Sequence, residues 1–240
     1  MAATRAQHYR ATRVPEGQPG ALAIFEDGDL VSLDPTAEQA RFTLHERMHR
    51  RAFELADLKG WLMLRGALVD IEGRRLLLLG PPGSGKTILT LRLGLRGAAI
   101  QGDDRVLLRD GELLAVARPL VLREDAAELV PELAGLAAGR PGTPGVSLLD
   151  PSRDLGLPWR LRIARVDHVV ALERTAGTPS CRPCPAVELL PMLAAALAAP
   201  NEPAPELLPA FASALQGATG YRVSVGDPVV AEDALRRLAC

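Results

Sequence analysis

Residues 75–87 read Arg75-Leu76-Leu77-Leu78-Leu79-Gly80-Pro81-Pro82-Gly83-Ser84-Gly85-Lys86-Thr87. From Gly80 onward they match G-x-x-x-x-G-K-[ST], in which the backbone N–H groups of a glycine-rich loop surround phosphate groups. The apolar run before the loop has the length of a strand, and Ile88–Leu93 after it suits a helix. This strand–loop–helix context forms an anion site at a helix N-terminus. The stretch therefore predicts a nucleoside triphosphate site in an α/β fold.

Each part of the loop has an expected role. Gly83 and Gly85 allow backbone angles and a close approach that side chains would block. Lys86 is expected to reach the terminal phosphates, and the Thr87 hydroxyl to bind Mg²⁺. Only Lys59 and Lys86 of the 28 basic residues are lysine, so the loop keeps a compact ammonium in an arginine-rich chain. We expect ATP and Mg²⁺ as cofactors, with the nucleotide bound by Gly80, Pro81, Pro82, Gly83, Ser84, Gly85, Lys86 and Thr87.

Bulk composition narrows the class of protein. A length of 240 residues suits one α/β domain with a modest extension, and a net charge of −1 gives no reason to expect a nucleic-acid partner. No signal peptide is visible, and the most apolar stretch, Leu189–Ala199, is too short to span a membrane. We therefore expect a cytoplasmic protein without a membrane partner. Cys181 and Cys184 form one C-x-x-C, interpreted as loop thiols rather than half a metal site or a redox pair.

The chain is expected to divide near Gly60. Residues 1–60 are predicted to form a small hairpin-and-helix extension, from a β-hairpin of Ala21–Glu26 with Asp29–Leu33 and a helix over Ala37–Leu58. Residues 1–14 are expected to be a solvated terminus. Residues 61–240 are predicted to be the phosphate-loop catalytic domain, with a mixed β-sheet.

The order of elements within residues 61–240 follows from turn and helix signals. A strand over Leu62–Ile71 turns at Glu72-Gly73 into Arg74–Leu79, and a helix after the loop ends near Arg96 before a strand over residues 98–101. After these elements we expect a hairpin of Arg105–Leu108 with Glu112–Val116 and a helix over Glu124–Leu136, followed by loops at Gly139–Pro144 and Pro151–Pro158 that form a flap. The last part of the chain is predicted to contain strands over Leu161–Leu172 and Tyr221–Val225, with helices over Pro185–Ala199 and Pro205–Leu215 between them, and a final helix from Asp227-Pro228.

A pair of carboxylates, Asp103-Asp104, follows the strand after the loop helix. The helix runs about 15 Å away from the phosphates and the strand returns over a similar length. If that strand lies next to the loop strand, both carboxylates reach the terminal phosphate. One can then hold Mg²⁺ while the other accepts a proton from an attacking hydroxyl. The alternative is an acidic strand-to-turn junction of the kind common on protein surfaces.

These residues together resemble a known family. Three stretches resemble the catalytic core of HPr kinase/phosphorylase and its shorter relatives, namely Leu68-Val69-Asp70, the phosphate loop and Arg96-Gly97-Ala98-Ala99-Ile100-Gln101-Gly102-Asp103-Asp104-Arg105-Val106. The pair Asp103-Asp104, which we call the diacid, stands at the same offset from the loop lysine as in that family. Arg118-Pro119-Leu120-Val121-Leu122-Arg123 is similar to the R-P-x-x-L-R stretch of the short relatives, and His168–Glu173 and Tyr221–Val223 fit their C-terminal pattern.

The resemblance implies a phosphate-loop core akin to phosphoenolpyruvate carboxykinase and ATP-dependent phosphorylation of a serine in a protein or precursor peptide. The resemblance also implies a role for each matching residue: Lys86 binds the phosphates, Thr87 and Asp104 hold Mg²⁺, and Asp103 is the general base. Arg65 stands where the family often has a histidine, and Gly102 where it has Ser or Ala. Arg65, Arg118 and Arg123 are candidate substrate or phosphate contacts.

Other functions stay open. Val169–Glu173 imitates a strand whose terminal glutamate activates water, which would make the chain an ATPase, although Glu173 also suits the end of an ordinary strand. A kinase acting on a small-molecule hydroxyl and a catalytically silent nucleotide-binding regulator are further alternatives. The acceptor, any reverse phosphorylase activity, the oligomeric state and the roles of residues 1–60 and the cysteines are not specified by the sequence.

Overall fold

The computed structural model describes residues 9–13, 22–57, 59–123, 126–133, 146–175, 180–197 and 205–239. Its contacts divide the chain into two compact units. One holds Met1–Leu58 with Pro141–Pro144, and the other holds Lys59–Arg140 with Gly145–Cys240. We call them the N-terminal unit and the core unit. Within the described part of the chain, no helix is long and apolar enough to cross a bilayer.

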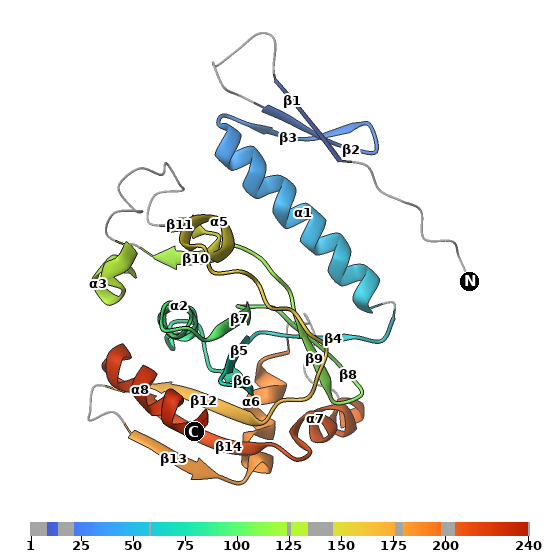
Figure 1. Cartoon of the computed structure of the whole chain (residues 1–240). Helices are drawn as coiled ribbons and strands as arrows, with labels where there is room; N and C mark the ends of the chain where they lie inside the picture. The colour runs from blue at the N-terminus through green and yellow to red at the C-terminus, as the bar shows by residue number, and fades with distance from the viewer. Residues whose placement is uncertain are drawn as a thin grey trace. The chain divides into compact units, whose positions relative to one another are not determined.

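The N-terminal unit contains a three-stranded antiparallel sheet and one long helix (Figure 1). The sheet has the order β1-β2-β3, and its strands are followed by α1. The bounds are β1 Tyr9–Arg13, β2 Leu22–Glu26, β3 Asp29–Asp34 and α1 Ala37–Asp57. Arg47 on α1 donates to Glu26 on β2 across 2.9 Å, which ties the helix to the sheet. Tyr9–Arg13 are ordered, because they pair along the whole of β2, and Arg10 is exposed to solvent as expected.

The core unit is built on a six-stranded mixed sheet of order β13-β14-β12-β6-β5-β7 (Figure 1). Its strands are β5 Ala67–Ile71, β6 Arg74–Leu79, β7 Ala99–Gly102, β12 His168–Arg174, β13 Ser180–Cys184 and β14 Thr219–Val225. β6, β12 and β14 run parallel, whereas β5 and β13 are antiparallel to their neighbours. β7 is antiparallel to β5 and therefore shares the direction of β6. The expected mixed α/β class is confirmed.

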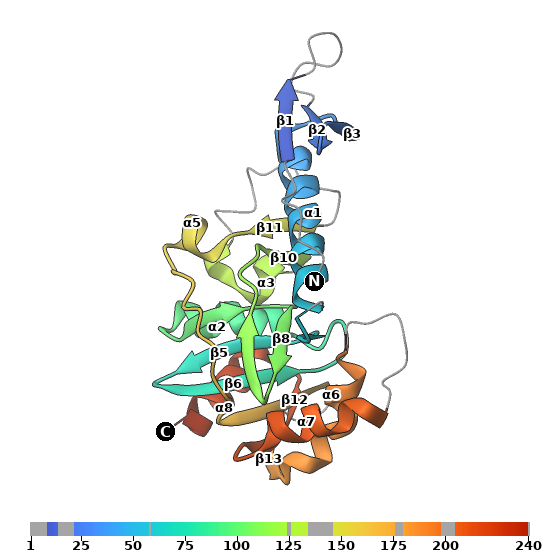
Figure 2. The same cartoon turned by 90° about the vertical axis from the view of Figure 1, so that its right-hand side faces the viewer.

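The leucine run of β6 is buried on both faces of this sheet. Leu76 and Leu78 pack with α2 (Lys86–Leu95) and α8 (Pro228–Ala239), while Leu77 and Leu79 face the opposite layer. Successive side chains of a strand alternate between faces, so a continuous apolar run requires a cover on each side. Figure 2 shows α2 lying along one side of β5 and β6. The strand that precedes the phosphate loop is therefore the centre of the core.

The second face is covered by a small sheet of order β4-β8-β9 and by helical segments. These elements are β4 Leu62–Leu64, β8 Val106–Arg109, β9 Glu112–Ala115, η2 Ala186–Leu189, α6 Leu190–Ala195, η3 Pro205–Leu207 and α7 Leu208–Leu215. The single strand expected over Leu62–Ile71 is divided at Arg65-Gly66, because β4 pairs with β8 while β5 pairs with β6. One segment thus contributes to two sheets.

A third cluster lies on the outer side of α2, where Leu91 packs against β10 and its neighbours. This cluster is formed by β10 Leu120–Arg123, α3 Ala126–Leu129, η1 Pro131–Leu133 and β11 Val146–Leu149, with α5 Pro151–Leu155 following. The expected loop at Pro151–Pro158 begins instead as α5, because Asp150 caps the N–H groups of Ser152 and Arg153. The Gly139–Pro144 half of the expected flap lies outside the described residues.

The strand expected over Leu161–Leu172 begins only at His168. The preceding backbone meets β9 only at one isolated bridge, between Ala164 and Leu113. A side chain adds to this hold, because the buried Arg75 guanidinium donates to the carbonyl oxygens of Arg162 and Ala164, and also to that of Leu113 on β9. These bonds help to satisfy the backbone carbonyls without a continuous strand ladder.

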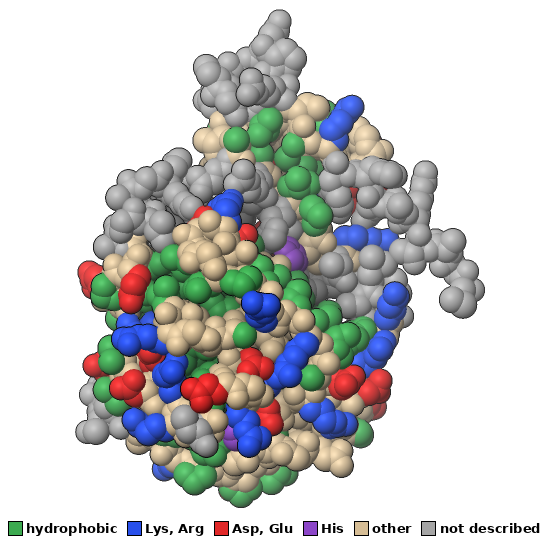
Figure 3. All heavy atoms as spheres, viewed as in Figure 1, with side chains coloured by type: hydrophobic (Ala, Val, Ile, Leu, Met, Phe, Trp, Pro, Cys, Tyr) green, Lys and Arg blue, Asp and Glu red, His purple; other side chains and the backbone are tan. Residues whose placement is uncertain are grey.

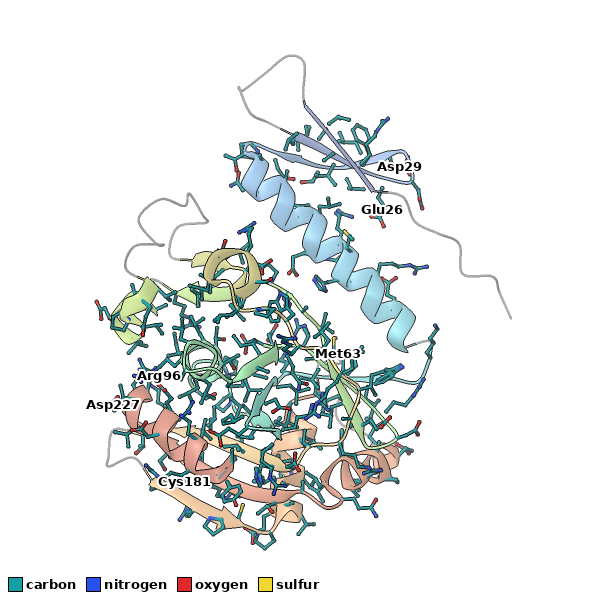
Figure 4. The ribbon with its side chains drawn as sticks, in the orientation of Figure 1. Glu26, Asp29, Met63, Arg96, Cys181 and Asp227 are labelled. Atoms are coloured by element: carbon teal, nitrogen blue, oxygen red, sulfur yellow. The ribbon has the colours of Figure 1, made fainter. Side chains whose placement is uncertain are left out.

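A buried ion pair joins the two helices on the α2 face. Arg92 Nε of α2 lies 2.9 Å from Glu232 Oε2 of α8, and the two side chains are 9% and 3% exposed. Arg92 also donates to the Leu129 carbonyl at the end of α3. Figure 4 labels Arg96 at the end of α2 and Asp227 just before α8, the helices that this pair connects. Removing one partner of a buried pair leaves an uncompensated charge in the core.

We predict that Glu232→Ala lowers the free energy of unfolding by about 3–5 kcal/mol, because Arg92 would stay buried without its carboxylate. The exposed neighbour Asp233 supplies the control, and Asp233→Ala should change stability by less than about 0.5 kcal/mol. Urea unfolding of both variants measures the difference. Equal stabilities for the two variants would contradict the structural role of the pair.

Candidate functional site

The phosphate loop connects the end of β6 at Leu79 to the start of α2 at Lys86. Gly83 and Gly85 have φ of 81° and 95°, a left-handed region that favours glycine. Ser84 N donates to Pro81 O across 3.1 Å, which closes a turn inside the loop. A Cβ on Gly80 would lie 2.7 Å from the Leu172 carbonyl oxygen of β12, so the loop begins directly against the neighbouring parallel strand. Its concave backbone opens at the N-terminus of α2.

Lys86 folds back over this loop. Its Nζ donates to Gly80 O at 2.7 Å and Pro81 O at 3.1 Å. Burial lowers the pKa of Lys86, whereas the nearby Asp103 and Asp104 raise it and Arg65 lowers it. The ammonium is therefore held by neutral carbonyl oxygens beside two carboxylates, and phosphate oxygens are stronger partners for a charged donor.

Thr87 and Asp103 are in direct contact. The Thr87 hydroxyl donates to Asp103 Oδ2 across 2.6 Å. Asp103 is only 4% exposed, and burial raises the pKa of its carboxyl to about 6 despite the Thr87 hydrogen bond. Its second oxygen, Oδ1, is buried with no hydrogen-bond partner among the described residues. An orphaned carboxylate oxygen beside a loop threonine is the kind of ligand that Mg²⁺ prefers.

Asp104 turns away from this contact. Its φ of 70° is left-handed, and its side chain is 46% exposed. Asp104 Oδ2 lies 3.3 Å from Arg118 Nη1 and 3.3 Å from Arg105 Nη1. The resemblance implies that Thr87 shares the metal with Asp104, but the structure pairs Thr87 with Asp103 and Asp104 with two arginines.

The diacid reaches the loop by a route other than the expected one. The strand before it, β7, is not next to β6, because β5 lies between them. The helix α2 packs on both β5 and β7, so its first turn lies close to the end of β7. A helix is about as wide as two strand spacings, which is why Thr87 still meets Asp103. The structure also explains why residue 102 is glycine, because a Cβ there would lie 2.7 Å from the Ala115 Cβ.

The structure separates the three candidate arginines. Arg118 is buried against Asp104, and Arg65 is exposed but near enough to Lys86 to lower its pKa. Arg123 ends β10 with an exposed side chain and makes no ion pair with the described residues of the loop or diacid. Arg105, which the sequence reasoning missed, belongs to the site through Asp104. Its position directly after the diacid was the available signal.

The two cysteines are not a chelating or redox pair. They lie on the strand β13 and not in a loop, and Cys181 packs with the α8 side of the sheet while Cys184 packs with the opposite side. Residues three apart in a strand are about 10 Å apart at Cα, beyond disulfide reach. Cys181, labelled in Figure 4, lines a cavity of about 290 Å³ with residues of β14 and α8. Among the described residues, no cluster of three or more His, Cys, Asp or Glu side chains could hold a metal ion by itself.

A magnesium ion fits this site through a small ligand set. Mg²⁺ is usually held by one or two carboxylates together with the substrate's phosphate oxygens and water. Thr87 Oγ1 and Asp103 Oδ1 could supply that set here, as one hydroxyl and one carboxylate oxygen. Beyond the site, the face in Figure 3 mixes acidic and basic side chains without one dominant sign on the core unit.

The fold and site define a mixed α/β protein in which a loop of phosphate-loop sequence lies beside an acidic pair. No protein-family model matches the chain, and no curated protein matches it. The solved structures that resemble it include the HPr(Ser) kinase/phosphatase from Coxiella burnetii, at 13% identity and a TM-score of 0.38. The alignment covers 73% of this chain and 95% of that one. A likeness of this size establishes neither a family nor an activity, so both depend on the site's own residues.

The buried Asp103 makes stability depend on pH. The folded-state pKa of about 6 lies above the usual 3.8, so the folded chain binds an extra proton between these values and its free energy of unfolding falls as pH rises through them. We predict that Asp103→Asn stabilises the fold by on the order of 3 kcal/mol at pH 8 and about half of that at pH 5.

Thermal melts of wild type and variant at both pH values measure this effect. The half-exposed Asp104 is the matched control, and Asp104→Asn should not stabilise the fold, because it removes a carboxylate that pairs with Arg118 and Arg105. A stabilisation by Asp103→Asn that is the same at pH 5 and pH 8 would contradict the buried, proton-binding carboxyl.

Proposed function

We propose that this chain is an ATP- and Mg²⁺-dependent kinase that transfers the γ-phosphoryl group to a serine-type hydroxyl of a protein or peptide. The observation that carries the proposal is the 2.6 Å hydrogen bond from Thr87 to Asp103. It joins the last residue of the phosphate loop to the first carboxylate of the diacid. A phosphate cradle and acidic groups at one point are the parts that phosphoryl transfer needs.

Nucleotide binding is assigned to the loop and the start of α2. Backbone N–H groups at a helix N-terminus favour an anion, and Gly83 and Gly85 keep the backbone open for a close approach. Lys86 exchanges its bonds to the Gly80 and Pro81 carbonyls for phosphate oxygens. This exchange needs only a rotation of the side chain, since Nζ already lies over the loop.

Thr87 and Asp103 are the residues that would hold Mg²⁺. When bound, the metal neutralises charge on the phosphate oxygens. Asp103 contributes a carboxylate that is held in place by the Thr87 hydroxyl and whose Oδ1 has no hydrogen-bond partner in the part of the chain that the structure describes. Because Asp103 is 4% exposed, an acceptor hydroxyl does not reach it easily, which argues for a metal role instead of the base role that the resemblance implies.

Asp104 is then the carboxylate that orients the acceptor hydroxyl and receives its proton. Its side chain is 46% exposed, and Arg118 and Arg105 fix its position. The acceptor oxygen forms a bond to the γ-phosphorus, the bond from that phosphorus to the ADP oxygen breaks, and the hydroxyl proton passes to Asp104. The transition state of such transfers is loose, so a carboxylate that orients the hydroxyl need not be a strong base.

The acceptor class is supported by sequence alone. The offset of the diacid from Lys86 and the Arg118–Arg123 stretch resemble HPr kinase/phosphorylase and its short relatives, which act on serine. That resemblance favours a protein or peptide over a small molecule. A regulator that only binds nucleotide has less support, because Lys86, Thr87 and both aspartates are all present.

Hydrolysis of ATP is a second candidate, and one observation favours it. Ala171 of β12 is the register partner of Leu79, so Glu173, two residues later, lies near the end of the strands at which the phosphate loop begins. A glutamate there can activate water. It is, however, paired with Arg222 across 2.8 Å, which occupies the carboxylate.

We predict that Asp104→Asn lowers the rate of transfer from γ-labelled ATP by about 10²–10⁴-fold with nearly unchanged Mg²⁺–ATP affinity, because an amide cannot accept the hydroxyl proton. Asp103→Asn should instead remove the gain in ATP affinity that Mg²⁺ provides. Calorimetric titration with and without Mg²⁺ and labelling of host peptides measure the two effects. The acidic turn residue Asp110, as Asp110→Asn, is the exposed control.

If Asp103→Asn lowered the transfer rate and Asp104→Asn removed the effect of Mg²⁺ on ATP affinity, Asp103 would be the base and Asp104 the metal ligand. Release of phosphate to water without transfer, sensitive to Glu173→Gln, would favour the ATPase. Nucleotide binding with neither transfer nor hydrolysis would favour the silent regulator.

A further inference from the structure

Arg65 lies beside the first residue of the phosphate loop. β5 is antiparallel to β6, with Ala67 opposite Leu78, so counting back two residues from Ala67 brings Arg65 level with Gly80. Figure 4 labels Met63 on β4, the short strand that leads into this position. Gly80 is also the residue whose carbonyl accepts from Lys86. Two separate segments that each carry a cationic residue, one with Arg65 and one with Lys86, thus meet at Gly80.

The backbone at Arg65 is fixed by its neighbours. Arg65 N donates to Ala196 O across 2.6 Å, and Leu64 forms an isolated bridge with Leu197. A Cβ on the following Gly66 would lie 3.1 Å from the Leu78 carbonyl oxygen, so the chain is pressed against β6. A side chain on such a backbone starts from a defined place, which reduces the cost of orienting it toward a ligand.

The Arg65 guanidinium is exposed and has no ion pair or side-chain hydrogen bond among the described residues. The register of β5 and β6 brings Arg65 level with Gly80, whose carbonyl oxygen accepts from Lys86 Nζ. Two cations next to each other repel unless an anion lies between them. Their shared position at the mouth of the loop matches the outermost phosphoryl group of a nucleotide bound there.

Arg118 and Arg105 do not meet these conditions. Both are bound to Asp104, and the Arg118 side chain is only 9% exposed. Reaching a phosphate would require Arg118 to leave a carboxylate that it already holds. Arg123 is exposed, but it makes no ion pair with the described loop residues.

We propose that Arg65 is a catalytic arginine, supplied by the chain itself, whose guanidinium binds the phosphoryl group as it is transferred. This role rests on the proposed phosphotransfer function and adds a residue to it. An arginine aimed at the equatorial oxygens stabilises the charge that develops in the transition state and contributes little to ground-state nucleotide affinity. Arg65 is therefore expected to act on the rate and on transition-state mimics more than on ADP binding.

The test uses the full chain with Mg²⁺–ADP and with Mg²⁺–ADP–aluminium fluoride, a mimic of the transferring phosphoryl group that needs no acceptor. Arg65→Ala should weaken binding of the mimic by about 10²-fold or more while changing Mg²⁺–ADP affinity by less than about threefold. Guanidinium ion added to Arg65→Ala should restore part of the loss, an effect that a structural role would not produce. Arg182→Ala, an exposed arginine on edge strand β13, is the matched control.

The outcomes separate this assignment from the proposed function. If wild type gains affinity on adding aluminium fluoride and Arg65→Ala keeps the full gain, Arg65 is not the catalytic arginine although the kinase proposal survives. Equal weakening of ADP and of the mimic would also overturn it, since that reports ground-state binding. If wild type binds no Mg²⁺–ADP, both the nucleotide site and the role of Arg65 fail.

Discussion

The side chain of Arg75 connects the strand before the phosphate loop with the strand before the diacid. It is fully buried on β6, five residues before Gly80, and its Nε donates to Gln101 Oε1 of β7 across 2.8 Å. Gln101 lies two residues before Asp103, so this bond spans β5 and fixes the strand that carries the loop against the strand that carries the diacid. Burial lowers the pKa of Arg75 to about 10, which still leaves the guanidinium charged at neutral pH. The cation is kept in the core by neutral oxygens of Gln101 and of backbone carbonyls, which satisfy its donors.

The residues of the candidate site hold one another in place. Lys86 fills the cradle with its own ammonium, and Thr87 holds the Asp103 carboxyl in place. The arrangement has a cost, because a buried carboxyl with an unpartnered oxygen destabilises the fold at neutral pH. Strain of this kind is expected where a binding partner is to supply the missing interaction.

The sequence predicted those parts of the structure that local chemistry determines. The loop, the strand before it and the helix after it follow from Leu76–Leu79, the glycines and Lys86, which lie within a single segment. The position of β5 between β6 and β7 could not be predicted, because strand order depends on long-range pairing. The same is true of Arg75, whose acceptors are 26 to 89 residues away along the chain. The partners of Asp103 and Asp104 also escaped prediction, since one left-handed residue at Asp104 turns adjacent carboxylates apart.

The outer strand of the main sheet carries a residue that limits association. Pro183 of β13 faces Tyr221 of β14 and has no N–H group, so a donor is missing from the ladder that β13 could offer to another chain. Arg182 beside it adds an exposed charge. At the opposite edge, Arg160 N already donates to the Ile100 carbonyl of β7. Both rims of the sheet are thereby poor templates for a further strand, which guards the folded chain against edge-to-edge aggregation.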